Sequence, residues 1–319
     1  MSKKRIEEKR QKQHKKTRLY AVIGSIVLVV VVGFFLFAWM NQVSLDKNLK
    51  LWYIDSSGKL NFSDRGPVNG RVVSTESANN YTLQKIVYES FGDNVFALLR
   101  VPKNVTKPPV VVVMPAASIT KEADEATAVA LCNMGYASLT LDARGIGDTG
   151  GDAQNDWATG FGKFESGGDP AQYKQVYDAL KGLDYVKSRS DLDGNNVSIL
   201  GESIGGMWAI VAAGIEPSFK GVVTISASDF DFNDTSDANA TRFINAVMPS
   251  KYLDSLTPRK IAMFQFDNDS VTLMADGKAL YDKALEPKAW HQYNGSVHGL
   301  WSPVIADDVH QELIGMLGR

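Results

Sequence analysis

The chain has 319 residues, of which 44% are apolar and 22% are charged, and its formal net charge is −2. This is enough apolar sequence for one large hydrophobic core, and it excludes a mainly disordered protein. The single cysteine, Cys132, excludes an intramolecular disulfide framework and a cysteine-based zinc site.

The charge is distributed unevenly along the chain. Residues 1–18 carry nine Lys or Arg side chains against two Glu, about +7, which leaves about −9 on the remainder. Residues 19–40 contain no charged side chain, and about 22 helical residues span roughly 30 Å, the thickness of the hydrocarbon core of a bilayer. The sequence therefore predicts a basic cytoplasmic tail over 1–18 and one transmembrane signal anchor over 19–40. A cleaved signal peptide and a buried core helix are the alternatives.

The basic flank also predicts an orientation. Because Lys and Arg beside a membrane span favour the cytoplasmic side, the residues after about 41 are expected outside the cytoplasm. Eight Asn-x-Ser/Thr sequences fit such a location. We expect a single-pass protein of the cell membrane, with the lipid bilayer as the partner of residues 19–40 and no nucleic acid bound by the tail.

The remainder of the chain divides into a polar part and a strand-rich part. Residues 41–80 are expected to form a stalk or linker with one possible hairpin, and residues 81–319 the folded domain. Two alternating segments, 81–88 and 95–101, are typical of antiparallel strands. After them strands alternate with helices, which predicts an α/β fold with a mostly parallel central sheet and helices on both faces. The predicted strands are 110–114, 137–141, 197–200, 221–225, 261–266 and 289–293, and the predicted helices are 122–134, 171–189, 204–213, 273–285 and 303–317.

The strongest chemical motif follows the strand at 197–200. It is Gly201-Glu202-Ser203-Ile204-Gly205, a G-x-S-x-G sequence that opens a helix. Glycines at these positions permit a tight turn that projects the serine hydroxyl outward, at a helix N-terminus that stabilises negative charge. This predicts Ser203 as a nucleophile.

A serine nucleophile needs a base and an orienting carboxylate. Among the four histidines, His298 alone lies in a predicted loop after a sheet strand; His14 is in the basic tail, His291 in a strand and His310 in a helix. The strand at 261–266 is followed by Asp267 and Asp269. Asp269 lies deeper in the loop and is the preferred triad acid, with Asp267 as the alternative.

The order Ser203, Asp269, His298 resembles that of the α/β-hydrolase superfamily, over roughly residues 81–319. Residues 142–150, Asp-Ala-Arg-Gly-Ile-Gly-Asp-Thr-Gly, are similar to a bracing loop of many members, with Thr149 in place of the usual Ser. The resemblance implies a backbone oxyanion hole from Ile204 and from the segment after strand 110–114. Many members have His-Gly-x there; this chain has Met114-Pro115-Ala116. Since proline has no N–H, Ala116 is the expected second donor.

The resemblance implies a serine hydrolase that cleaves small carboxylic esters through an acyl-enzyme intermediate. The alternatives are a peptidase or amidase of the prolyl or acylaminoacyl kind and a non-catalytic surface binding module. A short cap-like insertion is expected over about 227–258. No metal or cofactor is expected: the carboxylates near 191–202 approach the spacing of a calcium loop, but Asn196 stands where that loop needs Gly.

Overall fold

The computed structural model describes residues 31–33, 50–232 and 236–318 of the chain. It has two compact units, Met1–Lys50 and Leu51–Arg319. In the first unit residues 31–33 are helical; the predicted tail over 1–18 and the rest of the predicted span over 19–40 lie outside the described residues. Among the residues that are described, no helix is both long and apolar enough to cross a bilayer.

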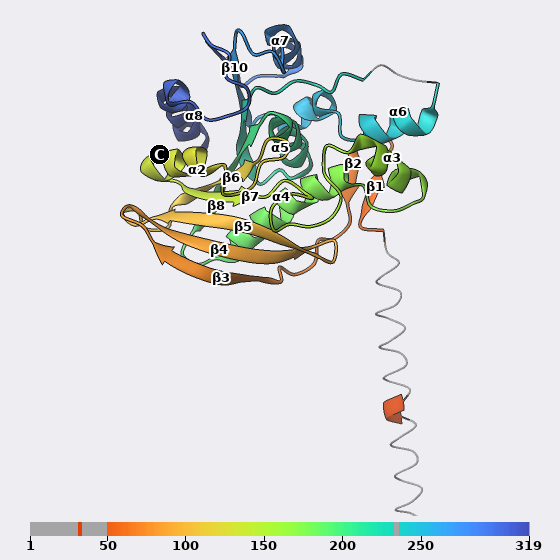
Figure 1. Ribbon diagram of the computed structural model, residues 1–319, viewed down its shortest axis with the longest axis horizontal. Coiled ribbons are helices and arrows are strands. Elements are labelled where there is room, and N and C mark those ends of the chain that lie inside the picture. The colour runs from red at the N-terminus through yellow and green to blue at the C-terminus, as the bar shows by residue number, and fades with distance from the viewer. Residues whose placement is uncertain (1–30, 34–49, 233–235, 319) are drawn as a thin grey trace, which may run out of the picture. The chain divides into compact units, whose positions relative to one another are not determined.

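The second unit is built on a nine-stranded sheet with the order β11-β10-β9-β8-β6-β7-β5-β4-β3 (Figure 1). The six strands from β11 to β7 run parallel, and β5, β4 and β3 continue the sheet in antiparallel pairs. The predicted mostly parallel sheet is confirmed. The strands are β3 Gly70–Ser77, β4 Tyr81–Ser90, β5 Asp93–Pro102, β6 Pro109–Met114, β7 Ala137–Leu141, β8 Asp193–Glu202, β9 Phe219–Ile225, β10 Lys260–Phe266 and β11 Lys288–Tyr293.

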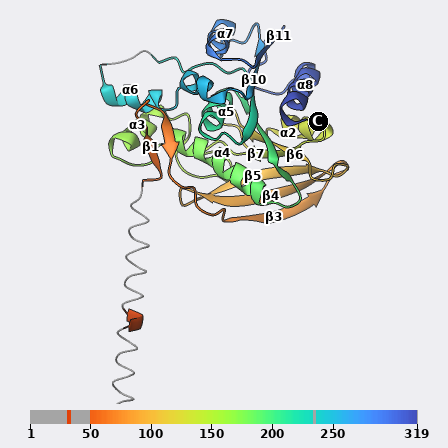
Figure 2. The ribbon, with the colours of Figure 1, turned by 180° about the vertical axis from the view of Figure 1, so that it is seen from behind.

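Helices cover both faces of this sheet, as predicted. On one face α4 (Ala171–Ser188), α5 (Ile204–Ile215) and α7 (Met274–Lys283) pack on side chains such as Val112 and Ile199. On the other face α2 (Glu125–Asn133) and α8 (Ala306–Leu317) pack on the alternate side chains of the same strands. Figures 1 and 2 both show α2 and α8 side by side. Every residue of β6 and β7 is buried, which explains the unbroken apolar sequence of β6.

The folded domain begins earlier than the sequence predicts, because residues 51–80 belong to it and do not form a stalk. The expected hairpin exists as β1 (Trp52–Ile54) and β2 (Leu60–Phe62). Leu60 is fully buried, and the Trp52 indole donates to Asp169 at 3.0 Å and packs on Tyr173. Strand β3 extends the sheet beside β4, but all its residues are exposed. Its polar sequence therefore lacks the alternation by which a strand is recognised.

The segment between β9 and β10 carries the expected cap-like insertion, residues 227–258, as far as the structure describes it. It contains α6 (Ala238–Asn245) and a 3-10 helix, η1 (Pro249–Leu256). Together with α3 (Trp157–Glu165), α6 lies above the end of the sheet near β1 (Figure 1). A second 3-10 helix, η2 (Pro303–Ile305), precedes α8.

Candidate active site

Ser203 occupies the sharp turn between β8 and α5. Its backbone has φ 53° and ψ −124°, a region that non-glycine residues rarely adopt. The Ser203 N–H donates to the Ile225 carbonyl at 2.8 Å, and the Ser203 carbonyl accepts from the Gly206 N–H at 2.8 Å. These bonds hold the strained turn and leave the hydroxyl free to project from the strand end.

The glycines around Ser203 are required by close backbone approach. A Cβ on Gly201 would lie 2.2 Å from the Gly205 carbonyl oxygen, and one on Gly205 would lie 2.2 Å from the Met114 carbonyl oxygen. Gly299, at φ +57°, passes so near that its Cβ would lie 2.7 Å from the Ser203 Cβ. The turn is therefore packed tightly between the end of β6 and the loop that contains His298.

Three of the predicted side chains form one hydrogen-bonded chain. The Ser203 hydroxyl lies 2.8 Å from His298 Nε2. On the other side of the imidazole, Nδ1 lies 2.9 and 3.0 Å from the two carboxylate oxygens of Asp269. With Nδ1 protonated and donating to Asp269, Nε2 is an acceptor for the serine proton.

The environment of Asp269 keeps its carboxylate ionised. Its side chain is fully buried, and burial alone would raise its pKa. Hydrogen bonds from His298 and from the backbone N–H groups of Val271 and Thr272 at 2.9 and 3.0 Å outweigh that effect. The pKa of Asp269 is therefore lowered, and a negative charge faces the imidazole.

Asp267, the alternative acid, makes different contacts. Its carboxylate accepts from the Gly295 N–H at 2.9 Å and from the Asn268 amide at 2.8 Å, so it holds the turns after β10 and β11 together. His291 faces Glu312 at 2.9 Å, and His310 packs edge-on against Tyr136. His14 lies outside the described residues.

The two expected oxyanion donors lie on either side of the turn. The N–H groups of Ile204 and Ala116 donate to no other group within the described part of the chain. The contact of Gly205 with the Met114 and Pro115 carbonyls brings the loop that bears Ala116 against the start of α5. Two free donors are thus available beside the Ser203 hydroxyl.

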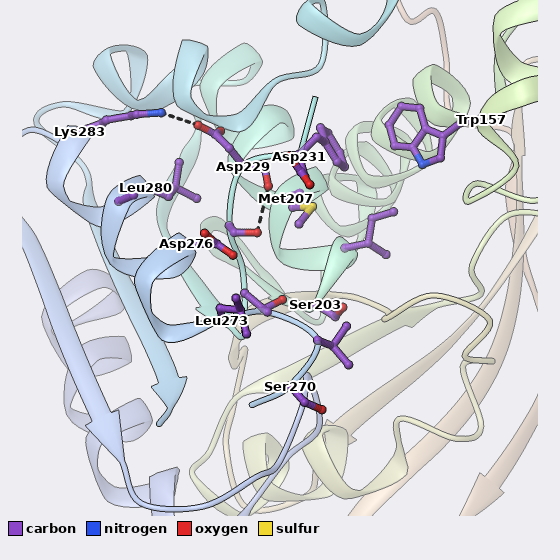
Figure 3. A pocket seen from close by; sticks show the side chains of 16 residues that line it. Trp157, Ser203, Met207, Asp229, Asp231, Ser270, Leu273, Asp276, Leu280 and Lys283 are labelled. Carbon is purple, nitrogen blue, oxygen red and sulfur yellow. Dashed lines mark hydrogen bonds and ion pairs between the residues drawn. The ribbon is translucent and has the colours of Figure 1, made fainter. Parts of the chain in front are cut away.

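A cavity of about 690 Å³ opens above Ser203 (Figure 3). Trp157 and Phe230, whose rings meet edge-on at 4.8 Å, form one wall, and Leu280 and Lys283 of α7 lie opposite. The Lys283 ammonium pairs with Asp229 at 2.7 Å. The other lining residues are Ile204, Met207, Ser228, Asp231, Ser270, Val271, Thr272, Leu273, Asp276 and Ala279.

Two phenylalanines of this region differ in position: Phe230 lines the cavity, whereas Phe243 is 1% exposed and packs in the core beside Tyr173. The sequence did not predict the lining residues of α7, because the pattern of an amphipathic helix does not indicate which edge of the sheet the helix lies against. Their position at the carboxyl end of β10 was the available signal.

The predicted bracing loop, residues 142–150, is held by buried polar contacts. Asp142 is buried and accepts from the N–H groups of Lys121, Asp148 and Thr149 at 2.9 to 3.1 Å. Thr149, in place of the usual Ser, keeps a hydroxyl that accepts from the Phe96 N–H at 2.9 Å. Arg144 forms a buried ion pair with Asp178 at 2.7 Å and so ties the loop to α4.

The fold is similar to that of solved esterases. An acetyl xylan esterase from Paenibacillus sp. R4 superposes with a TM-score of 0.68 at 18% identity, over 80% of this chain and 90% of that protein. One from Thermoanaerobacterium sp. JW/SL YS485 gives 0.65 at 14% identity, over 79% and 89%. At these identities the likeness establishes the fold alone.

Curated relatives match shorter stretches. The acetyl esterase Axe7A of Xylanibacter ruminicola is 29% identical over 133 residues, which is 39% of this chain and 30% of that protein. The YtaP protein of Bacillus subtilis is 32% identical over 90 residues, 28% and 29% of the two chains. The chain thus spans under a third of the length of either relative. By contrast, residues 71–242, more than half of the chain, match the acetyl xylan esterase (AXE1) family as a whole. On that match, the chain belongs to the acetyl xylan esterase family.

Proposed function

We propose that this protein is a serine hydrolase that cleaves carboxylic esters of small molecules. The observation that carries the proposal is the continuous chain from Ser203 through His298 to Asp269 at the floor of a cavity. Each member has the geometry its role needs. Ser203 presents its hydroxyl to the cavity from a strained turn, His298 lies between two hydrogen-bond partners, and Asp269 is a buried carboxylate that stays ionised. No metal or cofactor takes part in this chemistry.

The reaction follows from the positions of the groups. Ser203 Oγ attacks the ester carbonyl carbon as His298 Nε2 takes the hydroxyl proton. The N–H groups of Ile204 and Ala116 stabilise the tetrahedral oxyanion. His298 then gives its proton to the departing alcohol, and an acyl group remains on Ser203. Water, deprotonated by His298, attacks this acyl-enzyme, releases the acid and restores the serine.

Short acyl esters, acetyl esters above all, are the substrates that we expect. Family membership and the relatives named as acetyl and acetyl xylan esterases support this class. The cavity supports it as well, because the edge-on pair of Trp157 and Phe230 lines the same cavity as Ser203 and offers an apolar wall to the alcohol part of the ester.

Labelling with a fluorophosphonate tests the nucleophile. We expect the full-length chain to be labelled stoichiometrically and Ser203→Ala to be unlabelled yet equally folded by circular dichroism. Loss of the serine should lower kcat by about 10⁴-fold or more. Turnover is compared between p-nitrophenyl acetate, longer acyl esters and aminoacyl anilides. A folded wild-type protein that does not react, or anilide turnover above ester turnover, would contradict the proposal.

We also infer that residues 19–40 anchor the protein in the cell membrane with the hydrolase domain outside the cytoplasm. The uncharged span and its basic flank support this arrangement. Cys132, the native cysteine, is buried, so introduced cysteines report on their own position. In intact cells an impermeant maleimide should label Leu45→Cys and spare Gln13→Cys. After lysis both cysteines should be labelled, which serves as the control. The reverse pattern in intact cells, or labelling of neither cysteine in intact cells when both react after lysis, would refute the orientation.

A further inference from the structure

Two buried carboxyl groups lie directly behind the nucleophile and take no part in the triad. Glu202 is the last residue of β8 and precedes Ser203; its side chain is 1% exposed. Asp124 ends the loop from β6 to α2 and is 2% exposed. Although Asp124 stands at the N-cap position of α2, its side chain caps no N–H of that helix. Its carboxyl group is turned to Glu202.

The contacts of this pair require a proton. Each carboxyl group acts electrostatically on the other, and Thr127, three residues after Asp124 on α2, contacts Glu202. The Thr127 hydroxyl donates to Glu202 Oε1 at 2.5 Å, but within the described residues no protein group donates to Glu202 Oε2 or to either carboxylate oxygen of Asp124. Two ionised carboxylates cannot hydrogen-bond and repel each other, whereas one proton between them provides the missing donor.

The surrounding charges agree with a single proton. Arg100 of β5 is 2% exposed and acts electrostatically on Asp124, and its guanidinium lies 3.9 Å from the carboxylate of Glu125. The negative Asp142 at the end of β7 also faces the pair. With one shared proton, the pair and Arg100 sum to zero charge; without it, a net negative charge is buried. Accordingly, burial raises the pKa of Asp124 to about 7 and that of Glu202 well above its usual range.

We propose that Asp124 and Glu202 share one proton, and that this hydrogen bond positions the loop bearing Ala116 against the turn bearing Ser203. The loop runs from Pro115 to Asp124, so the pair ties down its far end while the contact with Gly205 fixes its near end. The two carboxyl groups are positioning residues, and their role rests on the proposed hydrolase function. Loss of the proton at alkaline pH leaves two buried negative charges that push the loop and its oxyanion donor away.

The pH profile of the full-length enzyme tests the proposal. For wild type, kcat/KM should fall about tenfold per pH unit once the shared proton is lost on the alkaline side. In Glu202→Gln the amide donates to Asp124 at every pH, so this alkaline decline should disappear. Asp124→Asn supplies the same donor from the other side and should behave alike, which guards against one variant failing to fold. Glu312→Gln, a control at a buried carboxyl of α8 bonded to His291, should leave the profile unchanged.

A second measurement observes the proton directly. Infrared difference spectra of wild type, titrated from neutral to alkaline pH, should contain the carbonyl band of a protonated carboxylic acid that Glu202→Gln lacks and Glu312→Gln keeps. Absence of that band, or an alkaline decline that persists in both Glu202→Gln and Asp124→Asn, overturns the shared proton. Failure of the hydrolase proposal is distinct, because fluorophosphonate would then not label wild type at any pH.

Discussion

Two buried carboxyl sites flank Ser203 and differ in protonation. Asp269 accepts hydrogen bonds from His298 and from two backbone N–H groups, and its pKa is lowered. Within the described residues, the Asp124 and Glu202 pair has one protein donor, the Thr127 hydroxyl, and burial raises both pKa values. Burial is common to both sites, so the number of donors decides which carboxyl stays ionised.

The difference in pKa between the two sites fits two different roles. An imidazole that accepts the serine proton becomes positive and needs a fixed negative charge beside it, which Asp269 supplies. A tie between a loop and a strand end needs a hydrogen bond, and the shared proton supplies it while Arg100 balances the one remaining negative charge. Under the two proposals, the same residue type serves catalysis on one side of Ser203 and positioning on the other.

Removing the charge on the triad side should have the largest effect. Asp269→Asn keeps the size of the side chain but loses the negative charge and the acceptor geometry for His298 Nδ1, so kcat/KM should fall by about 10⁴-fold. Asp267→Asn, two residues earlier, should cost less than about tenfold, because it changes a turn contact only. Ester hydrolysis by the two purified variants checks this, and equal losses would return the choice of acid to an open question.

The pH dependence of stability should show the two sites with opposite signs. Between pH 3.8, the ordinary pKa of Asp, and about 7, the folded pair holds a proton that the unfolded chain has released. Because the folded state holds this proton more tightly, the free energy of unfolding falls by about 4 kcal/mol as the pH rises from 3.8 to about 7. Glu202→Gln should gain stability over wild type across this window. Asp269, with its lowered pKa, stabilises above 3.8 and loses this contribution as the pH falls below it.

Urea unfolding of wild type, Glu202→Gln and Asp269→Asn at a series of pH values separates the two effects. The advantage of Glu202→Gln should vanish on acidification to about pH 4, and the deficit of Asp269→Asn should shrink in the acid range below that. If the free-energy difference between each variant and wild type changed with pH in the same direction for both variants, the two sites would not differ in protonation.

The sequence predicted one of these sites and missed the other. Asp269 follows a buried strand at the edge where parallel sheets place their sites, so fold class and chain order sufficed to find it. Asp124 lies at the start of a helix, where Asp is ordinary, and Glu202 reads as a neighbour of the nucleophile. Their contact joins residues 78 positions apart, and no local pattern reports it. Strand β3 escaped for a related reason, since its exposed faces remove the alternation that marks a strand.

A larger side chain in the turn that contains Ser203, between the two carboxyl sites, should destabilise the protein. In Gly205→Ala the new Cβ would lie 2.2 Å from the Met114 carbonyl oxygen, and backbone cannot yield as a side chain can. We expect a loss of about 3 kcal/mol in the free energy of unfolding and loss of labelling at Ser203. Gly162→Ala, in the exposed interior of α3 with no atom within 4 Å, should instead stabilise by about 1 kcal/mol. Thermal unfolding of both variants checks the contrast; similar melting temperatures would show that the turn can relax.

The smallest effect should come from removing the single protein donor at the pair. Thr127→Val deletes the hydroxyl that bonds Glu202 Oε1 and should cost about 1–3 kcal/mol, because a buried acceptor loses its partner. The cost should increase with pH, since the ionised carboxylate depends on that donor more than the protonated acid does. Thr224→Val is the matched control: its hydroxyl is equally buried but bonds no protein group in the described part of the chain, so the change should be neutral or stabilising. If both substitutions lower the free energy of unfolding equally at every pH, the Thr127 hydroxyl does not stabilise the ionised form of the pair. The number of hydrogen-bond donors would then not explain why the two carboxyl sites differ in pKa.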